Sequence, residues 1–134
     1  MTPQEELYKT LSESATLLDF IPVDKIVSEY PTEEMFGEND VGNNFPRLTF
    51  VLADRRHALY ADNTPLMDTL EFDIDLWLVN NMIVDYSLNT IKLEVDKIML
   101  GLGYYKLREE EQPLTFGRVQ NLSLSYTKEF PSNL

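Results

Sequence analysis

The chain has 134 residues, 23 acidic against 11 basic, and a formal charge of −12 at pH 7. This charge argues against sequence-independent nucleic-acid binding, which needs clustered Lys and Arg, and against docking on an anionic membrane. An apolar content of 43% is too high for a disordered chain, and the lack of cysteine excludes a disulfide scaffold, a cysteine nucleophile and a cysteine-ligated metal.

The length predicts a single domain over residues 1–134. The first residues lack the basic and apolar segments of a signal peptide, and no apolar run approaches the roughly 18 residues of a membrane helix. We therefore expect a soluble protein in a reducing compartment.

The N-terminus carries a helix-start signal, in which Thr2 is the N-cap, Pro3 the first helical residue and Glu5 the partner in a capping box. One apolar face follows, made by Leu7, Leu11, Ala15 and Leu18. Pro22 ends this predicted helix. Residues 23–30 are compatible with either a short edge strand or a helical turn.

Residues 31–46 contain two Pro, two Gly and three Asn, a composition typical of a loop. They offer little apolar surface to offset the entropy of ordering, so we expect a long mobile loop that includes Glu38 and Asp40.

Strands are predicted over residues 48–53 and 70–79, with a connection at 55–65 that turns at Ala61-Asp62-Asn63. In the second strand Leu70, Phe72, Ile74, Leu76 and Leu78 share one face.

A second long helix is predicted from about residue 85 to 100, capped by Asp85 or Ser87 and ended by Gly101 or Gly103. Its apolar stripe consists of Val84, Leu88, Ile91, Val95, Ile98 and Leu102. Further strands are expected at 104–108 and 119–127. The fold class is α+β: a largely antiparallel sheet of four or so strands, with two long helices packed on the Leu70–Leu76 face.

Glu71, Asp73 and Asp75 alternate along one strand, so neighbouring carboxylates lie about 6.6–6.8 Å apart on one face. This spacing suits an acid–base pair or a cation site, and equally the water-facing side of a half-buried strand. The same carboxylates would serve a small hydrolase acting through Asp73 or Asp75.

His57 has no Gly-x-Ser-x-Gly partner motif and is interpreted as a surface residue. Arg55 and Arg56 form an adjacent basic pair, which would either bind an acidic partner or solvate a turn. Glu109, Glu110 and Glu111 are interpreted as a solvated turn, and Gly101-x-Gly103 follows a helix and so does not indicate a phosphate loop. The sequence therefore predicts no catalytic set, no metal site and no cofactor.

Three segments of the chain resemble tail terminator (tail-to-head joining, or tail completion) proteins of long-tailed bacteriophages, the siphoviruses. They are Phe45-Pro46-Arg47-Leu48-Thr49-Phe50, then Tyr60-Ala61-Asp62-Asn63-Thr64-Pro65-Leu66, then Phe72-Asp73-Ile74-Asp75-Leu76-Trp77. A helix and a Gly-aromatic strand at Gly103-Tyr104-Tyr105 follow in the same order. The resemblance covers residues 45–130 and leaves 23–44 unmatched.

The resemblance implies a non-enzymatic virion protein at the head-proximal end of the tail, assembled in the host cytoplasm. It would form a hexameric ring, with a monomer as the free form, that stops tail-tube polymerisation and contacts the tail tube protein and the head connector. Six copies of charge −12 bring a net charge of −72 around a channel through which DNA passes without specific binding. The alternative to a virion protein is a protein of a different functional class, an acidic protein-binding module or inhibitor.

For such a ring we expect contacts from the loop (Glu38, Asp40), from Arg55 and Arg56, and from the Tyr60–Asp62 turn. The arginine pair would meet either the Glu71/Asp73/Asp75 row or Glu109–Glu111 of the next copy.

Overall fold

The computed structural model describes residues 1–134 except 38, 62–63, 80–86, 112–118 and 132–134; the side chains of 57–66 also lie outside the description. The helical elements are α1 (Pro3–Ser12), α2 (Ala15–Leu18), the 3₁₀ turns η1 (Val23–Lys25) and η2 (Glu33–Phe36), α3 (Val41–Asn44) and α5 (Ser87–Gly101). The strands are β1 (Ile26–Val27), β2 (Arg47–Ala61), β3 (Thr64–Val79), β4 (Tyr105–Glu111) and β5 (Val119–Pro131).

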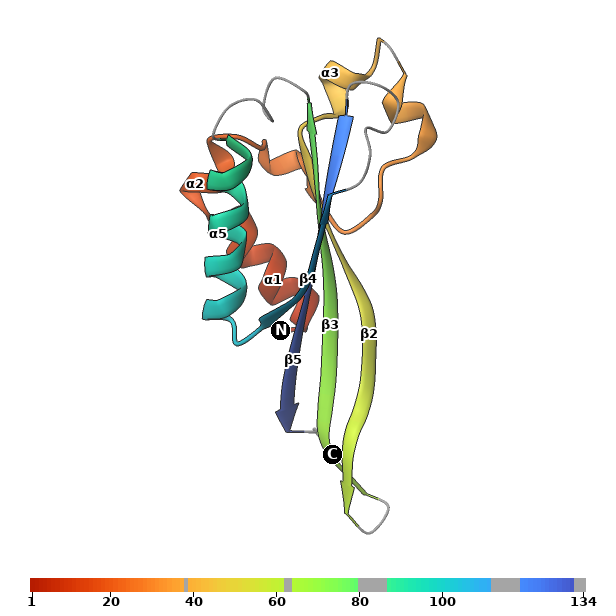
Figure 1. Ribbon diagram of the computed structural model, residues 1–134, viewed down its shortest axis with the longest axis vertical. Coiled ribbons are helices and arrows are strands. Elements are labelled where there is room, and N and C mark those ends of the chain that lie inside the picture. Colours follow the sequence, from red (N-terminus) through yellow and green to blue (C-terminus); the bar gives the residue numbers. More distant parts are fainter. Residues whose placement is uncertain (38, 62–63, 80–86, 112–118, 132–134) are drawn as a thin grey trace.

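The described strands form one five-stranded sheet in the order β1-β2-β3-β5-β4 (Figure 1). β1 runs parallel to β2, and every other neighbouring pair is antiparallel. The α+β class is confirmed. The sheet is mixed, however, because residues 23–30 supply both features that the sequence allowed: a 3₁₀ turn and then a two-residue edge strand.

The first helix begins as predicted, since the hydroxyl of Thr2 accepts a hydrogen bond from the backbone N–H of Glu5 at 3.1 Å. Its predicted length is wrong. α1 ends at Ser12, and Ser14 caps the short helix α2 by accepting from the N–H of Leu17 at 3.3 Å. This break rotates the apolar face, so that Leu17 is buried whereas Ala15 and Leu18 are exposed.

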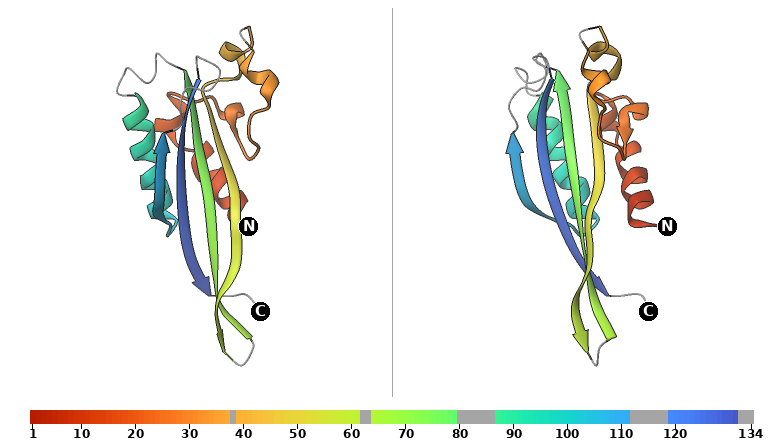
Figure 2. Two further views of the ribbon diagram at one scale, coloured as in Figure 1. Left: turned by 45° about the vertical axis from the view of Figure 1, so that its right-hand side comes forward. Right: turned by 90° about the vertical axis from the view of Figure 1, so that its right-hand side faces the viewer.

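β2 and β3 form one long hairpin, and the predicted connection at 55–65 is therefore wrong. The ladder runs from Arg47↔Trp77 to Ala61↔Thr64. A bulge at Ala53 and an irregularity between His57 and Leu59 interrupt the alternation of side chains between the two faces. The sequence pattern therefore does not indicate the full length of the strand. The far end of this hairpin extends beyond the helices as a twisted arm (Figure 2).

α5 ends in a Schellman motif at Gly103, one of the two predicted end residues. The N–H of Tyr104 bonds to the carbonyl of Met99 at 2.9 Å, and the N–H of Gly103 bonds to that of Leu100 at 3.0 Å. Gly103 has φ +92°, a conformation that side chains with a Cβ rarely adopt. The predicted start at Val84 and Asp85 lies outside the described residues.

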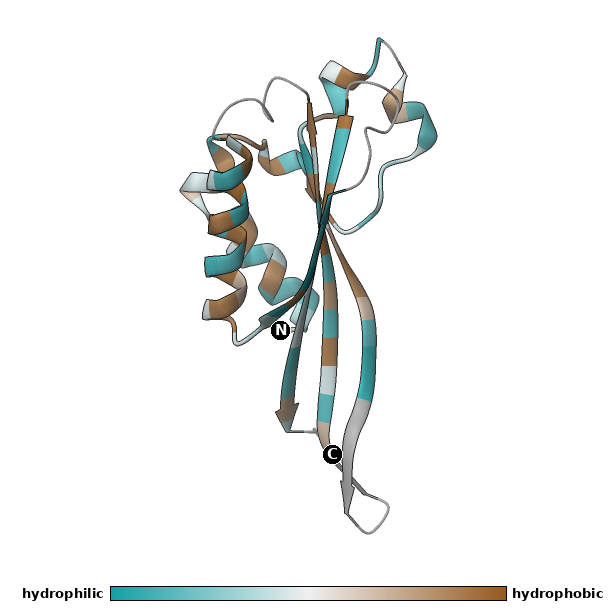
Figure 3. Cartoon of the chain, viewed as in Figure 1, coloured by the Kyte–Doolittle hydropathy of each residue, from teal (hydrophilic) through white to brown (hydrophobic). Residues whose placement is uncertain are grey.

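α1, α2 and α5 lie on one side of the sheet (Figures 1 and 3), and the main core lies between them and that face. Residues from α1, α2, α5 and the sheet are buried in one cluster, which includes Leu7, Leu11, Leu17, Phe72, Ile74, Leu76, Ile91, Val95, Leu122 and Leu124. The prediction that both long helices pack on the Leu70–Leu76 face is confirmed.

Residues 31–46 cover the upper end of the opposite face and contain the short helices η2 and α3. Their buried residues Phe36, Val41 and Phe45 form a second cluster with Val119, against which Trp77 and Val79 pack. The prediction of an irregular loop with little apolar surface is wrong, because these residues supply a small core. Mobility of the segment stays a prediction.

Candidate functional site

The carboxylate row lies on the sheet face opposite the helices, where β5 places hydroxyl side chains against it. Asp73 is paired with Ser125 and Asp75 with Ser123 in the ladder. The hydroxyl of Ser125 donates to Oδ1 of Asp73 at 2.7 Å. The row is therefore part of a polar ladder across two strands.

Asp75 is buried, with 4% of its surface exposed, so the interpretation of the row as a water-facing strip is wrong at this position. Its Oδ1 accepts from Nδ2 of Asn121 at 3.1 Å, and its Oδ2 is buried without a hydrogen-bond partner among the described residues. Burial raises the pKa of Asp75; Asn121 and Ser123 oppose the rise, and nearby Asp73 adds to it.

The environment of Asp75 gives little support to a hydrolase, because a substrate could not reach a buried carboxylate that is bonded to Asn121. Tyr30, which follows β1, lies near the row: burial first, and then the charges of Asp75 and Asp73, raise its pKa. Among the residues described, no group of three or more His, Cys, Asp or Glu is arranged to hold a metal ion.

Arg55 and Arg56 do not form one patch, because neighbouring residues of a strand point to opposite faces. Arg55 is paired with Leu70 on the helix-bearing face, lies 3.7 Å from a carboxylate oxygen of Asp68 and stacks over Phe130. Arg56 points to the other face, 3.3 Å from Asp54. The side chains of both arginines remain largely accessible, at 48% and 69%.

The other predicted contact residues are less informative. Glu38 and Asp62 lie outside the described residues, as do the side chains of His57 and Tyr60. Asp40 is exposed and precedes α3, where its carbonyl accepts from Nδ2 of Asn44 at 2.8 Å. The structure does not bring Asp40 together with the arginines or with the carboxylate row.

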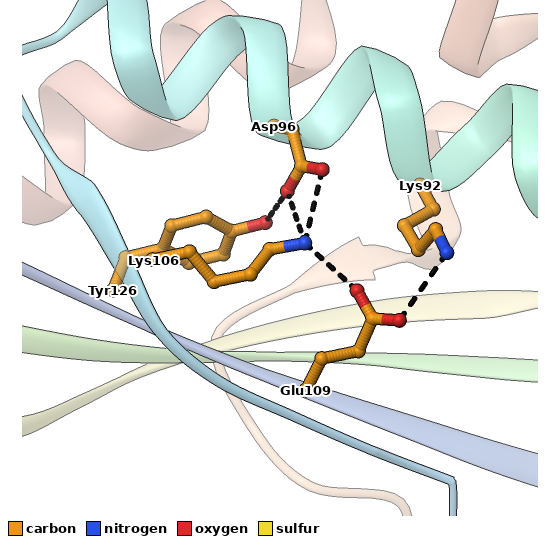
Figure 4. Close-up of polar contacts among 5 residues, drawn as sticks. All are labelled: Lys92, Asp96, Lys106, Glu109 and Tyr126. Atoms are coloured by element: carbon orange, nitrogen blue, oxygen red, sulfur yellow. Dashed lines mark hydrogen bonds and ion pairs between the residues drawn. The ribbon is translucent and has the colours of Figure 1, made fainter.

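Lys92 and Asp96 of α5 meet Lys106 and Glu109 of β4 and Tyr126 of β5 in a polar network (Figure 4). The ammonium of Lys106 lies 3.0 Å from Asp96 and 2.8 Å from Glu109, and that of Lys92 lies 3.2 Å from Glu109. The hydroxyl of Tyr126 donates to Asp96. The network fastens β4, the last strand of the sheet, to the helix.

A bulge at Leu107 explains why the sequence did not reveal this network. Residues three apart on a regular strand face opposite sides, but the register shifts between Lys106 and Arg108. Lys106 and Glu109 therefore both face α5. The interpretation of Glu109–Glu111 as a solvated turn is wrong, since all three residues belong to β4.

The network shifts the pKa values of Glu109 and Lys106 in the directions that stabilise their ion pair. The hydrogen bond from Lys106 is the main reason why the pKa of Glu109 is lowered. Burial alone would lower the pKa of Lys106, but its bonds to Glu109 and Asp96 leave that pKa raised. Burial raises the pKa of Tyr126, and its bond to Asp96 raises it further.

Two sides of the sheet remain open for pairing. β1 pairs only with Leu48 and Thr49, so no described strand lies on the outer side of β2, the side away from β3, from Phe50 to Ala61. β4 is the last described strand on the other side, and all seven of its residues are exposed. The described part of the chain thus presents two different strand edges on opposite sides of the sheet.

A groove of about 810 Å³ lies between α1, β1 and the residues that follow β1. Tyr8, Tyr30 and Phe50 are among its aromatic and apolar lining residues. Its acidic lining residues are Glu5, Asp24 and Glu29, and Arg47 is the basic one. This combination suits an apolar ligand that carries positive charge.

Comparison with protein-family models gave no match to this chain, and comparison with curated proteins gave none either. No helix in the described part of the chain is long and apolar enough to cross a membrane.

Proposed function

We propose that this protein is a structural component of a long-tailed phage virion that forms a ring at the head-proximal end of the tail. In this role it terminates the tail tube and joins the tail to the head connector, without catalytic activity. The order of the motifs between residues 45 and 130 supports the proposal.

The observation that carries the assembly role is the pair of open edges, β2 beyond Thr49 and β4, on opposite sides of one sheet. A closed ring with more than two members needs a head-to-tail interface, in which one surface of a subunit meets a different surface of the next. Two unlike edges on one subunit satisfy this requirement.

The net charge fits a channel for DNA. Each subunit carries −12, and the sheet face opposite α1 and α5 bears Glu71 and Asp73, both partly exposed. A wall of carboxylates repels phosphates, so DNA would pass without being held. In the virion the partners of the ring would be the tail tube protein and the head connector proteins.

Native mass spectrometry of the purified protein, with and without tail tube protein, tests the proposal. We expect six-membered assemblies that form or gain stability when tube protein is added. Deletion of the gene from its phage should give overlong tails that do not join heads, as seen by electron microscopy. Normal joined tails in the deletion, or a hydrolytic activity that Asp73→Asn abolishes, would contradict the proposed role.

The groove beside α1 favours a second candidate, an acidic protein-binding module. Such a module would stay monomeric or dimeric and bind a basic segment with apolar side chains through Tyr8 and Tyr30. Titration with a Lys/Arg-rich peptide containing Leu and Phe distinguishes the module from the ring protein. The module is favoured by micromolar binding that Tyr30→Ala weakens, together with a protein that stays monomeric when tube protein is present.

A further inference from the structure

The strand directions determine how a second copy could continue the sheet. β2, β3, β5 and β4 alternate in direction, because each is antiparallel to its neighbour. β2 and β4 therefore run in opposite directions within one subunit. If the next copy has the same orientation, its β2 lies antiparallel to the β4 it meets, which is the more stable pairing.

Charge selects one register for this pairing. β2 carries Arg55 and Arg56 in succession, and β4 ends with Glu110 and Glu111. In an antiparallel pair the numbers of opposed residues have a constant sum, so placing Arg56 opposite Glu110 also places Arg55 opposite Glu111.

The side-chain faces agree with the same register. Arg56 is paired with Thr69, and Glu110 with Ser123, and both partners lie on the face opposite α1 and α5. Arg55 and Glu111 are paired with Leu70 and Leu122, which lie on the helix-bearing face. Both arginines therefore point to the side where their glutamate would lie.

Two β4 strands pairing with each other would use the same edge of both copies. Such a pair closes at two subunits, so it cannot continue the sheet into a ring. The ion pairs that Arg55 and Arg56 make within their own subunit involve largely accessible side chains, and such pairs are weak enough to exchange.

We propose that the outer edge of β2 pairs antiparallel with β4 of a second copy, with Arg55 facing Glu111 and Arg56 facing Glu110. This inference rests on the proposed function in taking a second copy as the partner. Arg55 lies level with Leu70, whereas Glu111 lies level with Leu76, six residues along β3. Successive copies are therefore staggered along the strands, as strands are in closed barrels.

Charge exchange tests the pairing by sedimentation velocity at low salt. Arg56→Glu and Glu110→Arg should each weaken self-association about tenfold or more, because they oppose like charges, and the double variant should restore it. Lys97→Glu, the same charge change at an exposed position of α5, is the matched control and should have no comparable effect.

Cross-linking provides a readout that misfolding cannot imitate, since the chain has no cysteine of its own. Mixed Arg56→Cys and Glu110→Cys proteins should form a disulfide-linked dimer on oxidation. Within one subunit these positions lie on strands separated by β3 and β5, about 14 Å apart, beyond the reach of a disulfide. Lys97→Cys mixed with Glu110→Cys should stay largely monomeric.

The outcomes separate the interface from the function. A ring that forms normally in both single charge variants, without a disulfide between the Arg56→Cys and Glu110→Cys proteins, would overturn this pairing and leave the proposed function standing. A wild-type protein that stays monomeric even with tail tube protein would overturn both.

Discussion

Phe36 packs edge-on against Trp77, with ring centroids 5.9 Å apart and ring planes at 65°. Phe36 belongs to η2 and Trp77 to the sheet face that carries no long helix. The indole N–H of Trp77 in turn donates to the hydroxyl of Thr49 at 3.0 Å, which joins β3 to β2. This contact is where residues 31–46 are anchored to the rest of the fold.

Phe36→Ala should lower the free energy of unfolding by about 3 kcal/mol, at the low end for a buried phenylalanine because its cluster is small. Glu33→Ala, an exposed residue in the same turn, serves as the control in urea denaturation. Hydrogen exchange should show faster exchange of the Val41 and Phe45 amides in the Phe36 variant. Unchanged stability and exchange would mean that the segment is not held by this cluster.

Ile91→Ala and Val95→Ala should each destabilise the protein by about 1–4 kcal/mol, because both side chains are fully buried between α5 and the sheet. Leu93→Ala is the matched control, since Leu93 lies on the same helix with 64% of its surface exposed. Thermal or urea denaturation measures the difference. Equal effects at positions 91 and 93 would contradict the packing of α5.

Glu109→Gln should remove part of the acid sensitivity of the fold. The pKa of Glu109 is lower in the folded state than the unfolded value of 4.5, so its stabilising effect is present above that value. It is lost as the pH falls through the folded pKa. The wild type should therefore lose more stability between pH 5 and pH 3 than the variant, in urea denaturation at a series of pH values. Glu13→Gln, outside the network, should keep the wild-type slope.

The raised pKa of Lys106 affects the stability of the fold at alkaline pH. Its contribution is complete below the unfolded value of 10.5 and disappears only as the pH rises through the folded pKa. Lys106→Met should therefore flatten the loss of stability in strongly alkaline solution. A wild-type profile that falls already at pH 8 through this lysine would contradict the network.

Asp75→Asn should raise the free energy of unfolding at pH 7, because it removes a buried charge and keeps an oxygen acceptor for Asn121. The pKa of Asp75 is raised on folding, so the carboxylate begins to oppose folding as the pH rises through the unfolded value of 3.8, and the full cost is present above the folded pKa. The gain should vanish near pH 3, where the group is protonated in both states. Asp54→Asn, which changes a more exposed carboxylate, is the matched control. A loss of stability in Asp75→Asn at pH 7 would show that the charged form of Asp75 stabilises the fold.

Local sequence patterns were sufficient to predict the helices and strands whose hydrophobic periodicity is uninterrupted. Thr2 and Glu5 locate the start of α1, the stripe through Ile91 and Val95 locates α5, and the alternation from Leu70 to Leu78 locates the buried face of β3. In each case neighbouring residues along the chain determine the structure, so tertiary contacts change nothing essential.

The remaining features depend on residues that are distant in sequence or on a single extra residue. The bulge at Ala53 breaks the alternation of β2, and the bulge at Leu107 brings Lys106 and Glu109 to one face. Asp75 is buried by neighbours such as Asn121, 46 residues away. In the sequence, Phe36, Val41 and Phe45 are isolated apolar residues. They form a cluster only because the fold brings them together with Trp77 and Val119, which are distant in sequence.

The bulges at Ala53 and Leu107 both lie in strands whose outer edges are open, one on each side of the sheet. A bulge bends its strand and increases the local twist, so these two residues influence the direction in which each edge leaves the subunit. In an assembly that continues the sheet, this direction becomes the rotation from one copy to the next. We therefore expect deletion of Ala53 or Leu107 to change the number of subunits at which the assembly closes, or to leave it open as a filament.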